Sequence, residues 1–254
     1  MSTRAAQFQA TVRGREPLSD HLVRLVLDGL DGFESTGVPD EWVGLVVPGQ
    51  FQSRYYTVRS WADGELTLDV VIHDVGLVTE WATRDCLGDT VEITEPKGSF
   101  AMPAEAAWLI LVGDLTAMPA MARITGSVDV PTLVWAEVPD ELGDYLPQGI
   151  EVQWLETPDD GGSRLALVVE GIDWPEGEGY FWMAGESAQM RAIRKHLMRE
   201  VRLPSTAYDV MGYWRAGGVR QPRAVDPGPI WRAGKAAGKS DDEIWADYDR
   251  VRDG

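Results

Sequence analysis

Apolar and polar positions alternate in short runs over the first hundred residues of the chain. The runs are rich in branched or aromatic residues, and glycine, proline or charged residues separate them. Short runs at this spacing predict the strands of an antiparallel barrel or sandwich. We expect strands at 22–27, 43–48, 54–59, 66–73 and 90–94. A short helix is expected from about Thr79 to Cys86, with Thr79 as its N-cap.

The pattern changes after about Met102. Residues 108–112 form a continuous apolar run, which is typical of a parallel strand buried on both faces. Similar runs return at 132–136, 152–155 and 180–184, with helical or acidic loop segments between them. This alternation predicts an open α/β sheet.

Two further helices are expected towards the C-terminus. Gly185 opens the first, and its apolar face consists of Met190, Ile193, Leu197 and Val201. Prolines and glycines make 217–234 irregular. A capping box at 240–243 then begins an amphipathic helix.

These patterns predict an N-terminal antiparallel β-barrel, an open parallel-sheet α/β domain and a C-terminal helix. The boundaries that we expect are 1–103 for the barrel, 104–220 for the α/β domain and 221–254 for a linker with a docking helix.

Composition excludes several classes of function. A formal net charge of -18 repels nucleic acid and anionic membrane surfaces. The longest apolar run, 106–113, is too short to span a bilayer, and the N-terminus lacks the apolar core of a secretory signal. The single cysteine, Cys86, excludes an intrachain disulfide and a four-cysteine metal site. We therefore expect a cytoplasmic protein, and the three widely spaced histidines argue against a structural metal site.

Basic residues are distributed unevenly. Between Gly98 and Met190 the sequence has only Arg123 and Arg164, whereas eleven basic residues lie between Arg191 and Lys239. Either the basic stretch meets an anionic ligand, or the acidic and basic regions pair within the molecule. The sequence does not choose between these interpretations.

The run 54–59, Arg-Tyr-Tyr-Thr-Val-Arg, carries the most chemistry. An arginine guanidinium matches phosphate oxygens two at a time. A tyrosine offers a flat face to a ring, and a threonine hydroxyl can donate or accept. These groups suit a flavin dinucleotide. The alternative is an ordinary edge strand with solvated arginines.

Two junctions in the second half have the form of a strand that leads into a helix. They are 113–120, in which Gly113 lets the backbone turn and Pro119 suits a first helical turn, and 185–187. Neither is a G-x-G-x-x-G fingerprint, so each alone indicates a plain turn. A flavin-type motif on a β domain, followed by an α/β domain, suggests a flavin that takes electrons from a nicotinamide.

Several motifs occur in an order that points to one family. The stretches 54–59 and 212–217 match R-x-Y-T-x-R and G-Y-W-R-x-G. The stretches 96–100, 113–120 and 184–191 resemble P-[RK]-G-S, G-D-E-T-A-x-P-A and A-G-E…M-R. Together they resemble the siderophore-interacting proteins, which are flavin-dependent ferric-siderophore reductases related to the ferredoxin-reductase superfamily. The terminal stretch 237–248 also resembles that of many members.

The resemblance implies roles in binding FAD. Arg54 would neutralise the pyrophosphate, Tyr56 would pack on the flavin or ribityl, and Thr57 would hydrogen-bond near the flavin N5 edge. The other FAD-side residues that it implies are Val58, Val71, Ile72, His73, Val78, Thr79, Trp81 and Ala82.

The resemblance also implies an NAD(P)H side and a substrate side. Thr116 and Ala117 would lie where the nicotinamide approaches. Residues on the NAD(P)H side would be Asp114, Pro119, Gly185, Glu186 and Arg191, and those near the substrate or flavin would be Tyr213, Trp214, Arg215, Arg220 and Lys239. No general acid or base is expected, because the electron chemistry belongs to the cofactor.

Departures from the family pattern concern the pyrophosphate segment. The family reads H-G-x-x-G-P-A-S-x-W-A, whereas Asp74, Leu77 and Val78 here replace glycine, proline and alanine. A carboxylate and added bulk beside a pyrophosphate would weaken FAD binding. Leu115 also replaces the usual glutamate.

The expected function is reduction of Fe(III) in an imported siderophore by FAD that NADH or NADPH recharges, which releases Fe(II). The basic stretch would attract an anionic iron complex. Two alternatives remain open: a non-catalytic ferric-siderophore-binding protein with weakened FAD binding, and a general flavin reductase. A ferredoxin is a possible partner.

Overall fold

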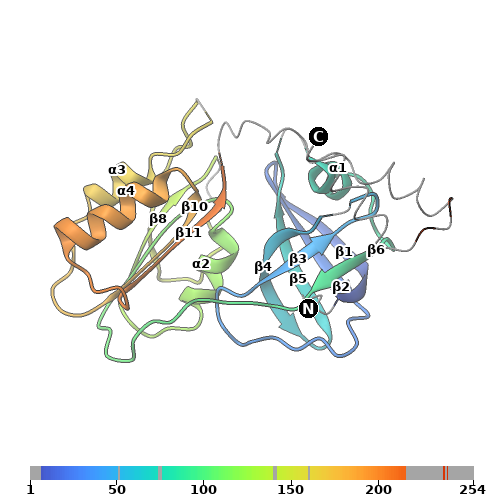
Figure 1. The fold of residues 1–254 in the computed structure, drawn as a ribbon, viewed down its shortest axis with the longest axis horizontal. Coiled ribbons are helices and arrows are strands. Elements are labelled where there is room, and N and C mark those ends of the chain that lie inside the picture. The colour runs from blue at the N-terminus through green and yellow to red at the C-terminus, as the bar shows by residue number, and fades with distance from the viewer. Residues whose placement is uncertain are drawn as a thin grey trace. The chain divides into compact units, whose positions relative to one another are not determined.

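The computed structural model describes residues 7–50, 52–73, 76–139, 142–159, 161–215, 237 and 239. These residues form a closed antiparallel barrel, followed by a five-stranded parallel sheet with helices (Figure 1). The prediction of the fold class is confirmed for both of these parts. The expected irregular segment and terminal helix lie outside the described residues, apart from 237 and 239, and the three-part division at 103 and 220 stays a prediction.

Six strands close the barrel in the order β1-β2-β5-β4-β3-β6. They are β1 (Gln7–Ser19), β2 (Leu22–Asp28), β3 (Trp42–Val46), β4 (Arg54–Ala62), β5 (Glu65–Val71) and β6 (Thr90–Thr94). Inward-facing leucines and valines fill the interior, as alternation of side chains along each strand requires. Strand β1 was not among the expected strands, although Ala10 and Val12 alternate with polar residues as in a strand with one buried face.

Helix α1 (Leu77–Thr83) begins two residues earlier than expected and ends before Cys86. Its N-cap is Gly76, whose φ of 148° favours glycine. The predicted cap, Thr79, lies inside the helix, and its Oγ1 accepts a hydrogen bond from the backbone N–H of His73 at 3.2 Å. The threonine therefore ties the end of β5 to the helix.

The parallel sheet has the order β11-β10-β7-β8-β9. Its elements are β7 (Leu109–Asp114), α2 (Met118–Thr125), β8 (Thr132–Glu137), β9 (Glu151–Leu155), α3 (Leu165–Glu170), β10 (Tyr180–Glu186), α4 (Gln189–His196), the π-turn η1 (Leu197–Val201) and β11 (Tyr208–Trp214). Helices α3 and α4 cover one face, and α2 packs on the other (Figure 1). The sheet therefore lies between two apolar layers.

One expectation for the sheet was wrong in detail, and one strand was missed. Gly185 lies inside β10, and the helix that it was expected to open begins at Gln189. The predicted apolar face is present, since Met190, Ile193 and Leu197 are buried. Strand β11 was not expected, because its sequence mixes polar and aromatic residues, although it pairs with β10 along its length.

Buried carboxylates of the barrel contact the sheet half of the molecule. In the described part of the barrel these are Asp40, Glu41 and Asp69. Asp40 accepts hydrogen bonds from the backbone N–H groups of Ser99 and Phe100, each at 2.9 Å. Glu41 pairs with Arg123 of α2 at 3.0 Å, and Asp69 accepts a hydrogen bond from the Tyr145 hydroxyl. Asp40 also accepts a hydrogen bond from Trp182 of β10 at 3.4 Å, so each buried charge has a donor on the sheet side. Asp69 is paired within the barrel as well, with Arg24 at 2.8 Å.

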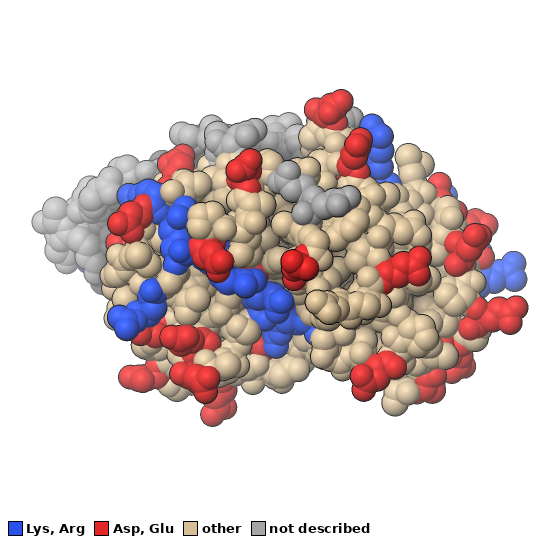
Figure 2. All heavy atoms as spheres, turned by 180° about the vertical axis from the view of Figure 1, so that it is seen from behind, with Lys and Arg blue, Asp and Glu red and all other residues tan. Residues whose placement is uncertain are grey.

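The surface is predominantly acidic. Figure 2 shows Asp and Glu side chains spread over one face, with Lys and Arg side chains gathered in a band on its barrel half. Of the basic stretch, Arg191, Arg199 and Arg202 are exposed on α4, η1 and the residue that follows. In the described residues, no helix is long and apolar enough to cross a membrane.

Candidate functional site

Strand β4 presents the flavin-type motif at one end of the barrel. Arg54 and Tyr55 are exposed, the tyrosine by 69%. Tyr56 packs against the barrel core, and burial raises its pKa to about 12. Thr57 is buried, and Val58 belongs to the core itself. The exposed guanidinium is therefore available to phosphates, whereas Val58 could contact a ligand only through its backbone.

Helix α1 turns most of its predicted site residues inward. The side chains of Val78, Trp81 and Ala82 are in the barrel core, and the Trp81 Nε1–H donates to Asp89 at 2.8 Å. Leu77 is 54% exposed. The substitution at Val78 therefore adds no bulk outside the barrel, while the substitution at Leu77 does.

The end of β5 connects this helix to the junction with the sheet. Val71 packs against the apolar cluster on the α2 face of the sheet, and Ile72 packs against the barrel core. His73, held by Thr79, follows directly. Of these three predicted residues, His73 is tied directly to α1.

The carboxyl end of β7 carries Asp114, which is buried. Its Oδ1 accepts hydrogen bonds from the backbone N–H of Thr116 at 2.9 Å and from the Thr116 hydroxyl at 2.5 Å. Burial raises the pKa of Asp114. Ala117 caps α2 and Pro119 lies in its first turn, both buried, so Thr116 is the residue of this group with an exposed part.

Neighbouring strands end in buried carboxylates as well. Glu186 at the end of β10 accepts hydrogen bonds from the backbone N–H groups of Ala188 at 2.7 Å and Gln189 at 3.2 Å. Glu137 at the end of β8 accepts one from the N–H of Arg164 at 2.8 Å, and burial raises its pKa. These carboxylates take up backbone donors at the edge where α/β sheets bind ligands.

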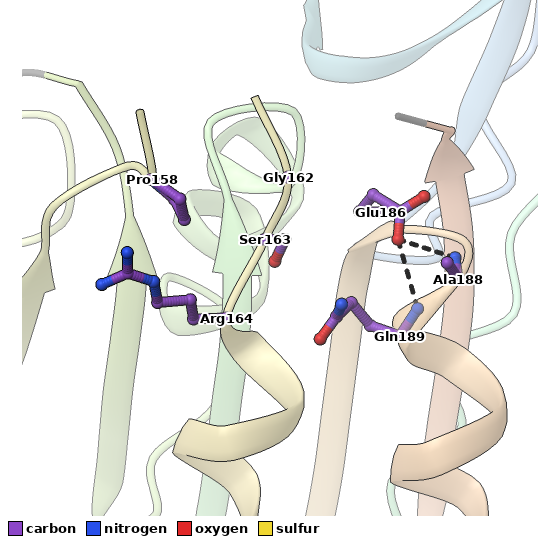
Figure 3. A pocket seen from close by; sticks show the side chains of 7 residues that line it. All are labelled: Pro158, Gly162, Ser163, Arg164, Glu186, Ala188 and Gln189. Carbon is purple, nitrogen blue, oxygen red and sulfur yellow. Dashed lines mark hydrogen bonds between the residues drawn. The ribbon is translucent and has the colours of Figure 1, made fainter. Parts of the chain in front are cut away.

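A pocket of about 310 Å³ opens at this edge (Figure 3). It lies between the starts of α3 and α4, and it is lined by Pro158, Gly162, Ser163, Arg164, Glu186, Ala188 and Gln189. Figure 3 shows the Arg164 side chain extending towards Pro158. Except for Glu186, sequence reasoning did not select these residues. The sequence did contain a signal for Arg164, because it is one of two basic residues between Gly98 and Met190.

Strand β11 brings the third group of predicted residues to the same edge. The Tyr213 hydroxyl is buried beside Thr57 of the barrel. Burial raises its pKa. Trp214 is partly buried, and Arg215 is exposed. The barrel motif and β11 thus meet, whereas Arg191 is exposed on α4.

Two predicted residues are not placed in this group. Arg220 lies outside the described residues, and Lys239 is described as exposed. The donors of the barrel and of β11 nevertheless fit FAD. Arg54 offers an exposed guanidinium for phosphates, and the buried Tyr213 hydroxyl keeps unused hydrogen-bonding capacity beside Thr57.

Comparison with protein families matches the chain in two adjacent stretches. Residues 49–100 match the model described as "Siderophore-interacting FAD-binding domain", and residues 106–217 match the one described as "Siderophore-interacting protein". The chain belongs to the siderophore-interacting protein family. Its barrel stretch is an FAD-binding domain of that family, which confirms the prediction of FAD.

Relatives of this siderophore-interacting protein include two named reductases. The ferric vibriobactin reductase ViuB of Vibrio cholerae is 30% identical over 176 residues, which cover 65% of each chain. The NADPH-dependent ferric-chelate reductase of Escherichia coli is 28% identical over 240 residues, covering 82% of this chain and 92% of that protein. The solved siderophore-interacting protein of Acinetobacter baumannii superposes with a TM-score of 0.75 at 22% identity, covering 84% of this chain and 92% of that one.

Proposed function

We propose that this protein is a ferric-siderophore reductase in which FAD passes electrons from NAD(P)H to siderophore-bound Fe(III). The observation that carries the proposal is the meeting of Thr57 with Tyr213. It brings the flavin motif of the barrel to the carboxyl edge of the sheet, where a nicotinamide nucleotide binds in folds of this kind. The named reductases among its relatives support the same function.

The barrel residues have distinct tasks in this proposal. Arg54 pairs with the pyrophosphate of FAD, Tyr56 supports the flavin from the barrel core, and Thr57 offers a hydroxyl to its edge. When bound, FAD would supply the electron chemistry, because a flavin can take up a hydride and release single electrons. The chain itself orients the rings and excludes water. No side chain needs to transfer a proton, because the electron chemistry belongs to the cofactor.

The pocket beside Arg164 suits the adenosine end of the electron donor. Hydroxyl groups of a ribose can donate to carboxylates, and a guanidinium can pair with a 2′-phosphate. Arg164 is exposed at this pocket and Glu186 is part of its wall. NADPH is therefore the expected donor, and the name of the Escherichia coli relative agrees with this choice.

The substrate is expected to be a ferric chelate with hard oxygen ligands. Such ligands hold Fe(III) tightly and Fe(II) much less tightly, so one electron releases the metal. The siderophore-binding alternative without catalysis rests on the substitutions at 74, 77 and 78. Val78 is buried in the barrel, so its substitution adds no bulk at the cofactor and does not support this alternative. Leu77 is exposed, so its substitution still supports it.

The experiment is a visible spectrum of the purified, FAD-reconstituted protein under anaerobic conditions. NADPH or NADH is added first, and a ferric siderophore second. We expect NADPH to bleach the flavin faster than NADH, and the iron complex to restore the colour. The control is the same addition with a gallium siderophore, which has no accessible lower oxidation state.

Each other result points to a different function. Bound flavin that neither nucleotide reduces would contradict the nicotinamide donor and favour a protein donor such as a ferredoxin. Recovery of colour with free flavin but not with the iron complex would favour a general flavin reductase. No bound flavin would favour the non-catalytic binding protein.

A further inference from the structure

Asp114 and Trp214 are joined across a strand that lies between them. In the sheet, β10 separates β7, which ends at Asp114, from β11, which ends at Trp214. The indole Nε1–H of Trp214 donates to Asp114 Oδ2 at 2.5 Å. The indole therefore reaches over the carboxyl end of β10 to the neighbouring strand.

Gly185 leaves the path for this contact open. A Cβ atom at position 185 would lie 2.6 Å from Asp114 Oδ2 and 3.3 Å from Leu165 Cδ1. Its φ of +158° is also a conformation that side chains rarely adopt. Three family motifs thus meet at one point, because each supplies one member of the arrangement: the aspartate, the glycine or the tryptophan.

Both partners of the hydrogen bond are fixed by other contacts. The Trp214 carbonyl accepts hydrogen bonds from the Ser187 N–H at 2.7 Å and from the Ser187 hydroxyl at 2.6 Å. Asp114 is held by Thr116 through its other oxygen. The indole ring is therefore anchored at its backbone and at its nitrogen.

We propose that Asp114 is a positioning residue of the electron-transfer site, which acts by holding the Trp214 ring over the carboxyl end of β10. This inference rests on the proposed function. Ligands of open α/β sheets bind in the crevice outside these strand ends, and a fixed indole offers a flat wall to a ring there. An indole ring that is held in one position keeps the nicotinamide close to its reactive position.

The first measurement tests the contact without any cofactor reaction. In protein labelled with ¹⁵N at its eleven tryptophans, the W214F variant identifies the indole N–H signal of Trp214. We expect D114A to move this signal upfield and to speed its exchange with solvent, because the acceptor is lost. D114N keeps an acceptor oxygen and should leave the signal closer to its original position.

The second measurement is the rate of flavin reduction in a single turnover with NADPH. D114A and W214F should each slow reduction by about tenfold to a hundredfold, since a misplacement of about 1 Å can cost a hundredfold. The double variant should be no slower than either single variant, because both remove the same interaction. The control is W108F, which makes the same substitution at the opposite end of β7, where Trp108 donates to Gly177 O at 3.3 Å.

Additive losses in the double variant, or an equal loss in W108F, would overturn the positioning role. An indole signal that D114A leaves in place would overturn the contact itself. If neither nucleotide reduces the wild-type flavin, the proposed donor fails, and the positioning role fails with it. The indole signal would then still show whether Asp114 holds Trp214, so the two failures remain distinguishable.

Discussion

One hydroxyl at the junction of barrel and sheet serves two carboxylates. Ser99 Oγ lies 2.9 Å from Asp40 Oδ2 and 2.6 Å from Asp209 Oδ2. A hydroxyl has a single hydrogen, so it can donate to only one of them. Burial and the neighbouring Asp40 charge raise the pKa of Asp209. Of the two carboxylates, Asp209 is therefore the one whose protonated form the fold stabilises.

This arrangement predicts that D209N stabilises the protein at neutral pH by about 1 kcal/mol. A raised pKa in the folded state means that ionising Asp209 costs stability as pH rises above the ordinary aspartate value of about 3.9. Asparagine keeps a donor for Ser99 and removes the charge. Urea unfolding of both proteins between pH 4 and 8 should show a difference that is small at pH 4 and grows with pH. A constant difference would contradict this assignment.

At the scale of elements, the helix after β10 ends in an uncommon way. The π-turn η1 follows α4 and stops at Arg202, which has a φ of 63°. The backbone N–H of Leu203 then bonds to Leu197 O at 3.0 Å. A left-handed residue at a helix end is usually glycine, because a Cβ is unfavourable there.

A change of arginine to glycine should therefore have opposite effects at positions 199 and 202, which are three residues apart. R202G relieves the left-handed strain and should raise the free energy of unfolding by about 1 kcal/mol. R199G lies within the turn and should lower it by about 1 kcal/mol. Both side chains are exposed, so neither change removes a core contact. Thermal unfolding of the two variants, compared with wild type, measures the signs, and equal signs would refute the explanation.

Sequence reasoning worked best where an element has a strong pattern or a short motif. The apolar runs gave β7 and β10, and the motif at 54–59 marked β4. The pattern could not reveal β11, because its sequence mixes polar and aromatic residues and forms no apolar run. Nor could it show that Val78 and Trp81 point into the barrel, or that Trp214 bonds to Asp114, since such contacts depend on elements far apart in sequence.

At the scale of the whole molecule, Arg123 is the main cation at the contact between α2 and the barrel. It reaches Glu41 at 3.0 Å and donates to the carbonyl of Val58 at 2.7 Å. Burial alone would raise the pKa of Glu41, but hydrogen bonds from Ser35 and Thr36 and the charge of Arg123 outweigh it, so the pKa is lowered. The pair therefore contributes stability above the ordinary glutamate pKa, and this contribution is lost as pH falls.

R123M should destabilise the protein by about 3 kcal/mol at pH 7, because it leaves a buried carboxylate without its cation. The matched control is R164M, which removes the other basic side chain of the acidic middle from an exposed position and should change stability by less than about 0.5 kcal/mol. Urea unfolding measures both. Equal effects of the two variants on stability would contradict the stabilising role of the Arg123–Glu41 pair.

The three buried carboxylates of the barrel also bear on how such a protein can change by recombination. Each of them has a donor on the sheet side, which is Trp182 for Asp40, Arg123 for Glu41 and Tyr145 for Asp69. Glu41 and Asp69 also have partners within the barrel. A barrel grafted onto a foreign sheet that lacks the sheet-side donors would leave each of these buried carboxylates with fewer hydrogen-bond partners than it has here. Chimeras cut between β6 and β7 should therefore fold only when the sheet-side donors come from the same parent as the three carboxylates. The barrel and the sheet are thus expected to be inherited together.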